Sequence, residues 1–182
     1  ILAVLMMTPA MSHGHEHDSK KSAMLVVSFG TSMPEARKAI DNLVNTVKKE
    51  FPSVDVRLSF TSNIIRRKIA REQGENIMNP SQALAQLNDE GYSYVTVIPT
   101  HMIPGEEYNE ILDVAGAFAG MSGKYGFEEI GVCRPFLDGV KECDVMADIL
   151  MKRFSKQLED KEVGIVLMGH GTPENFANAQ YL

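Results

Sequence analysis

The histidine best placed for chemistry in this chain is His170, which stands between two glycines. It follows the apolar residues 164–168, whose pattern predicts a buried strand. Loops at strand ends hold ligands in α/β proteins, and glycines let a ligand approach the backbone closely. A neutral imidazole can bind a divalent metal or accept a proton near neutral pH. One histidine does not make a metal site, so His170 requires partners from elsewhere.

Residues 24–31 have the same residue pattern as the segment around His170. In both, an apolar run is followed by a loop of small residues that ends with Gly-Thr. When the two segments are aligned on that Gly-Thr, Phe29 falls opposite His170. Two interpretations stay open, an internal repeat of one βα unit or a chance match of two short apolar segments.

A second cluster of candidate residues occupies 99–108, where a predicted strand leads into a predicted helix. His101 stands where that strand leaves the core, and it is either a functional residue or a structural one bonded to a neighbouring strand. Glu106 and Glu107 fall in the first turn of the helix. The helix dipole stabilises negative charge there, so helix capping is the simplest role for both carboxylates.

Strand and helix patterns alternate along the chain. Strands are predicted at 24–29, 54–59, 93–99, 128–132 and 163–168, and helices near 34–50, 62–72, 81–90, 106–119 and 139–158. This order predicts an α/β fold with a parallel sheet flanked by helices, whose ligand loops lie beyond the carboxyl ends of the strands. Dinucleotide, P-loop and serine-hydrolase motifs are all missing from those loops.

The composition is that of an ordinary globular protein, with 44% hydrophobic residues among 182 and a net charge of −6. That charge argues against a nucleic-acid partner. No segment approaches the roughly 20 apolar residues that a membrane span needs. Cys133 and Cys143 are either joined by a disulfide or present as two buried thiols.

The first residues predict export. Residues 1–12 are interpreted as a clipped signal peptide, because an apolar run is followed by small residues at the −3 and −1 positions of a cleavage site. Residues 13–22 are interpreted as a flexible tail in which His13, His15 and His17 alternate. The tail either captures a divalent metal such as Cu²⁺ or Ni²⁺ or only solubilises the chain. A soluble periplasmic protein is expected, truncated at both ends.

Five motifs now form a recognisable set: residues 27–32, 34–37, 60–62, 99–108 and 168–172. In this order they resemble the anaerobic, ATP-independent (class II) sirohydrochlorin cobaltochelatase family, which is related to ferrochelatase. The resemblance implies a chelatase-like fold of two α/β lobes that enclose a tetrapyrrole. It places the first lobe at 23–160 and the start of a second, truncated lobe at 161–182.

The resemblance also implies roles for individual residues. His170 would be a metal ligand and proton acceptor, with a further glutamate and histidine ligand expected beyond Leu182. The backbone N–H groups of Gly30 and Thr31 would bind a substrate carboxylate at a helix start. The implied substrate-binding residues are Ser28, Phe29, Gly30, Thr31, Ser32, Thr61, Ser62, His101, Gly105 and Glu106.

The implied activity is insertion of Co²⁺ into sirohydrochlorin, with Fe²⁺ and Ni²⁺ as alternative metals. Cobalamin biosynthesis is cytoplasmic, whereas this chain carries a predicted export signal. The alternative is therefore a non-catalytic periplasmic carrier that holds a tetrapyrrole, haem or a metal in the same cleft. The sequence does not define the oligomeric state, and a homo-oligomer is one option.

Overall fold

The structure is a computed structural model that describes residues 20–173 and 175–179. The predicted signal peptide, residues 1–12, and the three histidines of the predicted tail lie outside the described residues. Strand β1 (Lys21–Ser28) begins earlier than the sequence pattern predicts, so the last two residues of the predicted tail 13–22 belong to the sheet.

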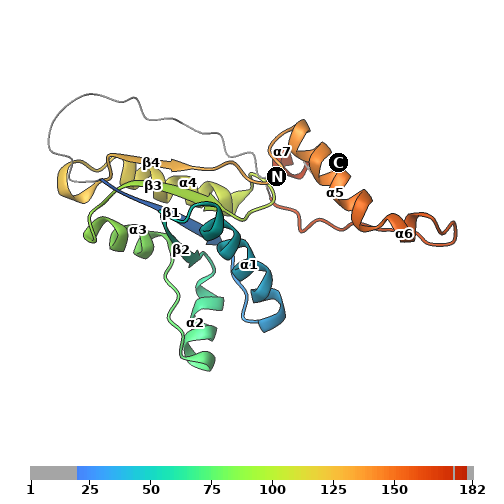
Figure 1. Ribbon diagram of the computed structural model, residues 1–182, viewed down its shortest axis with the longest axis horizontal. Helices are drawn as coiled ribbons and strands as arrows, with labels where there is room; N and C mark the ends of the chain where they lie inside the picture. The colour runs from blue at the N-terminus through green and yellow to red at the C-terminus, as the bar shows by residue number, and fades with distance from the viewer. Residues whose placement is uncertain (1–19, 174, 180–182) are drawn as a thin grey trace.

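A four-stranded, all-parallel sheet forms the centre of the fold (Figure 1), which confirms the predicted α/β class. β1 is paired on both sides, because the strand order is β2-β1-β3-β4. The other strands are β2 (Asp55–Phe60), β3 (Tyr92–Pro99) and β4 (Glu129–Val132). The helices are α1 (Pro34–Glu50), α2 (Asn63–Gln73), α3 (Pro80–Asp89), α4 (Glu106–Ala119), α5 (Val140–Arg153), α6 (Ser155–Leu158) and α7 (Asn175–Asn178), with a 3₁₀ turn η1 (Gly123–Tyr125).

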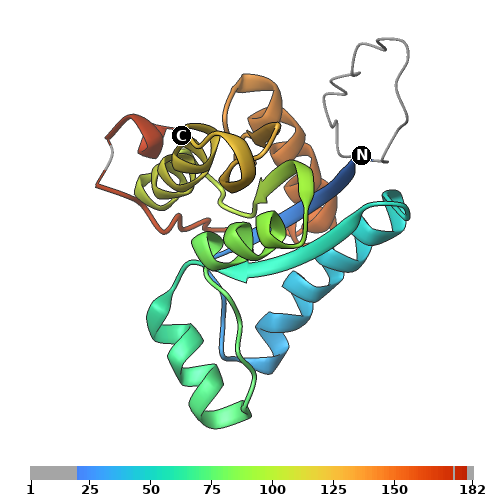
Figure 2. The same ribbon diagram turned by 90° about the vertical axis from the view of Figure 1, so that its left-hand side faces the viewer.

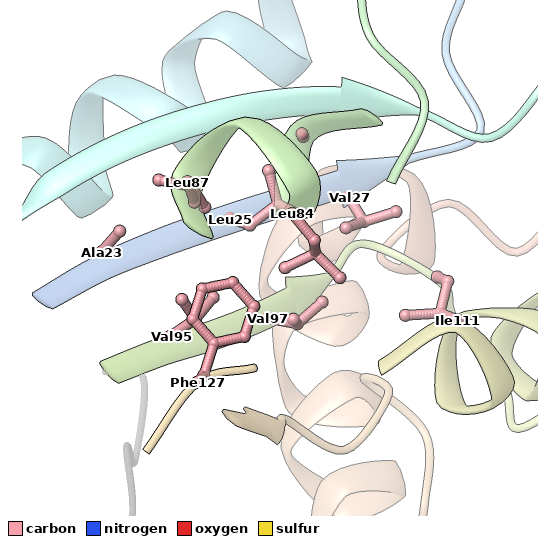
Figure 3. Close-up of a cluster of buried hydrophobic side chains, with 10 residues drawn as sticks. Ala23, Leu25, Val27, Leu84, Leu87, Val95, Val97, Ile111 and Phe127 are labelled. Atoms are coloured by element: carbon pink, nitrogen blue, oxygen red, sulfur yellow. The ribbon is translucent and has the colours of Figure 1, made fainter. Parts of the chain in front are cut away.

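Helices cover both faces of the sheet, because alternate residues of β1 point to opposite sides. Val26 packs with Val44 and Val47 of α1 on one face. Leu25 and Val27 pack on the other face, in a cluster that includes α3 and α4 (Figure 3). Figure 2 shows α1 and α3 on opposite sides of the strands. This two-sided burial explains why β1 has a continuous apolar run rather than an alternating pattern.

Local signals in the sequence set several helix starts. Pro34 is the first residue of α1, where a missing N–H costs no hydrogen bond. Asn79 and Gln82 form a reciprocal capping box at the start of α3. These starts agree closely with the predicted helices at 34–50 and 81–90.

The predicted strand at 163–168 is wrong. Among the described residues this segment pairs with no strand, and Val166 and Met168 are 90% and 94% exposed. An apolar run makes a buried strand only when neighbouring strands supply hydrogen-bond partners, and the four-stranded sheet supplies none to it. The predicted helix at 139–158 is also divided, because Phe154 leaves helical geometry between α5 and α6.

The structure also describes both cysteines. Cys133 and Cys143 are not joined by a disulfide, and burial raises the pKa of the Cys133 thiol. No helix within 20–173 or 175–179 has the length and apolar character needed to cross a membrane.

Candidate functional site

The candidate site lies at the carboxyl edge of the sheet, where β1 and β3 are neighbours. The chain leaves β1 toward β2 on one side, whereas β3 continues to β4 on the other side. Such a switch point opens a crevice between diverging loops and is the usual ligand position in open α/β sheets. Backbone bonds hold the loops together: Thr61 N–H donates to the Ser28 carbonyl at 2.9 Å, and Thr100 N–H donates to the Val27 carbonyl at 2.8 Å.

Gly30 is required by the conformation of the loop after β1. Its φ is +95°, and a Cβ added there would stand 2.4 Å from Cδ2 of the buried Phe60 ring. The Gly30 N–H, which the family resemblance assigns to a substrate carboxylate, donates to Oγ of Ser28 at 3.3 Å. Ser28 itself is buried. Ser28 and Gly30, both predicted to bind substrate, therefore determine the conformation of this loop through the hydrogen bond between them.

The rest of this loop is more open. Phe29, which follows β1, is 47% exposed, which leaves its ring available to an apolar surface. Oγ1 of Thr31 accepts the N–H of Met33 at 3.1 Å, so that hydroxyl stabilises the turn into α1. Ser32 is half-buried, and its carbonyl accepts a bond from Nε2 of Gln73 at 3.4 Å.

Thr61 and Ser62, at the end of β2, differ in how their hydroxyls are used. Ser62 is the N-cap of α2, and its Oγ accepts the N–H of Ile65 at 3.3 Å. Oγ1 of Thr61 is buried and has no hydrogen-bond partner among the described residues. Of this predicted pair, Thr61 is the one with unused hydrogen-bonding capacity.

His101 follows β3 and is nearly enclosed, with a side chain only 9% exposed. Its Nε2 lies 3.2 Å from Oε2 of Glu107, but the two groups are not aligned for a hydrogen bond, and neither ring nitrogen has another partner among the described residues. Burial lowers the pKa of His101, opposed by the nearby negative charge of Glu110. The imidazole is therefore neutral near pH 7.

Glu107 is the carboxylate that the structure brings into the site. Burial raises the pKa of Glu107 and the adjacent Glu106 carboxylate adds to the rise, while the positive charge of protonated His170 opposes it. Glu106, the glutamate favoured by the family resemblance, is exposed at the start of α4. Two consecutive carboxylates in a first helical turn look equivalent in the sequence. The burial that distinguishes them depends on where the helix packs.

His170 is exposed and oriented by its own loop. Its Nδ1 lies 3.0 Å from the carbonyl oxygen of Gly171. A carbonyl only accepts, so Nδ1 carries the proton in the neutral ring and Nε2 presents its lone pair. This is the tautomer that a metal-binding histidine needs when Nε2 is the ligand atom.

The loop that carries His170 is docked on the loop between β3 and α4. A Cβ added at Gly105 would stand 3.1 Å from Oγ1 of Thr172, so the small residue permits this approach. Asn178 also holds this loop with two hydrogen bonds to Thr172. Its Oδ1 accepts the N–H of Thr172 at 2.9 Å, and its Nδ2 donates to the Thr172 carbonyl at 2.6 Å. Ala177 is buried beside Ile103.

The structure thus brings three predicted site residues, His101, Gly105 and His170, to one end of the sheet. Glu107, for which the sequence favoured a helix-capping role, joins them. No group of three or more His, Cys, Asp or Glu side chains in the described part of the chain is arranged to hold a metal ion. The imidazole of His170 and the carboxylate of Glu107 are donor types that suit a divalent cation.

Comparison with known proteins identifies the family of the chain. A family model described as cobalt chelatase (CbiK) matches residues 22–182. The sirohydrochlorin cobaltochelatase CbiKC of Nitratidesulfovibrio vulgaris is 30% identical over 154 residues, which are 84% of this chain and 52% of that protein. The sirohydrochlorin cobaltochelatase of Salmonella typhimurium is 30% identical over 152 residues, which are 83% of this chain and 55% of that protein.

The chain spans about half the length of the curated relatives that it matches. The family match nevertheless covers all of the sheet except Lys21, every loop at its carboxyl edge and the Gly-His-Gly segment. By this match, the chain belongs to the CbiK cobalt chelatase family.

Proposed function

We propose that this chain supplies the metal-delivering loop of an ATP-independent chelatase that inserts Co²⁺ into sirohydrochlorin. The observation that carries the proposal is the state of His170: an exposed imidazole, with Nδ1 against the Gly171 carbonyl, beside the charge of Glu107. Both curated relatives are named as sirohydrochlorin cobaltochelatases. The proposal transfers that activity to this protein.

Metal insertion requires Co²⁺ to shed water and two pyrrole N–H protons to leave the ring. In the proposed reaction, the lone pair on Nε2 of His170 holds the metal above the macrocycle. The same nitrogen cannot bind the metal and accept a proton at once, so proton acceptance follows metal transfer. The raised pKa of Glu107 makes its carboxylate a stronger base, suited to accept the other proton.

The loops at the carboxyl edge supply the proposed tetrapyrrole cleft. Phe29 offers an exposed aromatic ring to the macrocycle, and the N–H of Thr31 near the start of α1 offers a donor to a carboxylate. The other proposed lining residues are Ser28, Gly30, Ser32, Thr61, Ser62, His101, Gly105 and Glu106. Within the two-lobe organisation, residues 23–160 form the first lobe and 161–182 begin the second.

The test uses the full-length protein and follows Co²⁺ insertion into sirohydrochlorin by absorbance. His170→Ala is expected to lower the rate at least about 100-fold, the scale typical of a lost acid–base group. Added imidazole should restore part of the rate by filling the space left by the ring. Lys49→Ala, an exposed change at the far end of α1, serves as the control and should keep the wild-type rate.

The experiment also separates the enzyme from a carrier. Export, predicted from residues 1–12, favours a periplasmic carrier of a tetrapyrrole, haem or metal as the second candidate. A carrier retains pigment or metal on purification and does not accelerate insertion. Equal insertion rates with and without protein would reject the enzyme. Cell fractionation tests the periplasmic location, light scattering tests a homo-oligomer, and parallel assays with Fe²⁺ and Ni²⁺ test the metal.

A further inference from the structure

We propose that His101 is a positioning residue: its buried Nε2–H fixes the carboxylate of Glu107 so that Glu107 and His170 bind the incoming divalent metal together. This inference rests on the proposed function, because it assigns His101 a role in the same metal-delivering site. His101 itself does not contact the metal in this proposal. It acts through Glu107.

The first argument is the state of the imidazole. The side chain of His101 is 9% exposed, and both ring nitrogens are buried with no hydrogen-bond partner among the described residues. A buried polar group without a partner costs folding free energy, so a histidine with only a structural role would be expected to be bonded. Oε2 of Glu107 lies 3.2 Å from Nε2 of His101, close enough to become that partner.

The second argument is that the backbone around His101 is fixed. The Phe136 N–H donates to the His101 carbonyl at 3.2 Å, and the Leu137 N–H donates to the Met102 carbonyl at 2.7 Å. On the other side, the Thr100 N–H bonds to β1. The imidazole is thereby held in a defined place at the end of β3, and the partner that adjusts is Glu107.

The third argument concerns Glu107, whose side chain is 42% exposed and so has room to rotate. Hydrogen bonds of catalytic groups often tighten and align when the ligand binds. A small rotation aligns one carboxylate oxygen with the Nε2–H of His101. The other oxygen remains for the metal beside His170, whose loop approaches the start of α4 where Thr172 meets Gly105. Hydrogen bonds of this kind orient metal ligands in many proteins.

The test measures Co²⁺ binding to the full-length protein without tetrapyrrole, by the visible absorption of bound Co²⁺, for His101→Leu and His101→Gln. Leu fills the space without a donor, and the Co²⁺ Kd is expected to rise about tenfold, the lower range for such supporting residues. Gln can place an N–H near the position of Nε2, and its Kd is expected within about threefold of wild type. In the insertion assay the Leu variant should show the change in KM for Co²⁺ rather than in kcat.

Thermal unfolding separates positioning from a structural role. His101→Leu removes two unpaired buried nitrogens and breaks no hydrogen bond, so Tm should stay equal or rise while Co²⁺ affinity falls. A fall in affinity that follows a fall in Tm for both variants would overturn the proposal. So would a Leu variant with wild-type affinity.

A double-mutant cycle tests the route through Glu107. If His101 acts only by holding that carboxylate, Glu107→Gln should weaken Co²⁺ binding, and adding His101→Leu should weaken it no further. Additive losses would overturn the proposal, and so would a wild-type protein that fails to bind Co²⁺. A protein that binds Co²⁺ but does not insert it would reject the proposed chelatase activity. It would leave the positioning role intact, because that role is measured by Co²⁺ binding.

Discussion

Thr172 lies directly over Gly105: a Cβ added to Gly105 would stand 3.1 Å from Oγ1 and 3.3 Å from Cβ of Thr172. The backbone of Gly105 is extended, with φ −90° and ψ −170°, so the contact rather than the backbone demands a glycine. The approach brings the Gly-His-Gly segment against the loop that carries His101. A side chain at position 105 should therefore act on His170 without touching it.

We expect Gly105→Val to displace the Thr172 loop and weaken Co²⁺ binding by the full-length protein about tenfold, since supporting residues commonly change metal affinity by this much. Overpacking should also lower the free energy of unfolding by about 1–3 kcal/mol. Isothermal calorimetry and urea denaturation measure the two effects. The matched control is Gly116→Ala in α4, where an added Cβ meets no atom within 4 Å. That change should stabilise the helix by about 0.5–1 kcal/mol.

A second pair of glycines separates steric clash from backbone strain. Gly30→Ala should destabilise the protein by more than about 2 kcal/mol, because it combines a positive φ with a Cβ 2.4 Å from the Phe60 ring. Gly74→Ala has a similar positive φ of +69° but an open surrounding, so it should cost about 1 kcal/mol. Urea denaturation of both variants measures the difference. Equal losses would show that the Phe60 contact is unimportant.

Asn178 should control the mobility of the loop around His170. Asn178→Ala removes both hydrogen bonds to the backbone of Thr172, whereas Asn178→Asp keeps an acceptor for the Thr172 N–H and loses the donor to its carbonyl. Hydrogen exchange of the Thr172 amide should accelerate most in the Ala variant and less in the Asp variant. The Thr100 amide, bonded to the Val27 carbonyl, is the internal reference and should keep its protection.

The stability of the opposite edge of the sheet should depend on pH through Asp55. Burial raises the pKa of this carboxyl, but hydrogen bonds from the Tyr92 hydroxyl and the Arg57 guanidinium, each at 2.8 Å, outweigh burial and hold the pKa below its ordinary value. The folded pKa is therefore lower than the unfolded one. Such a group stabilises the fold above its unfolded pKa, and this contribution disappears as the pH falls through the folded pKa.

Asp55→Asn should accordingly lower the free energy of unfolding by up to about 1 kcal/mol near pH 7. The effect is small because the ion pair of Asp55 with Arg57 is partly exposed and is screened by water. The difference from wild type should shrink near pH 3. Urea denaturation at both pH values measures it, with the exposed Asp144→Asn on α5 as the control. A difference that stays constant between the two pH values would contradict the assignment.

Much of the fold follows from local sequence signals. The four strands of the sheet were predicted within a few residues, because β1 is an apolar run and β2 alternates apolar with polar residues. Pro34 marked the start of α1 correctly. The strand predicted at 163–168 failed for a physical reason: an apolar run reports a tendency to be buried, whereas a strand also needs hydrogen-bond partners that the run does not encode.

Parts of the candidate site could also be predicted, where local sequence signals mark a residue. His170 and His101 stand out in the sequence because of their glycine and proline neighbours. Glu107 does not, since it matches Glu106 in type and in helical position, and only packing makes it the half-buried member of the pair. The two hydrogen bonds of Asn178 were equally invisible, because they depend on a short helix folding back beside Thr172.

The central place of β1 has a consequence for the order in which the protein can assemble as it is synthesised. β1 pairs with β3 as well as with β2, and the β3 strand ends at Pro99. Until that residue has left the ribosome, β1 has an unpaired edge and Leu25 and Val27 lack the strand and helix that cover them. The nascent chain through Phe60 is thus an aggregation-prone intermediate, and synthesis of the next 39 residues is what protects it.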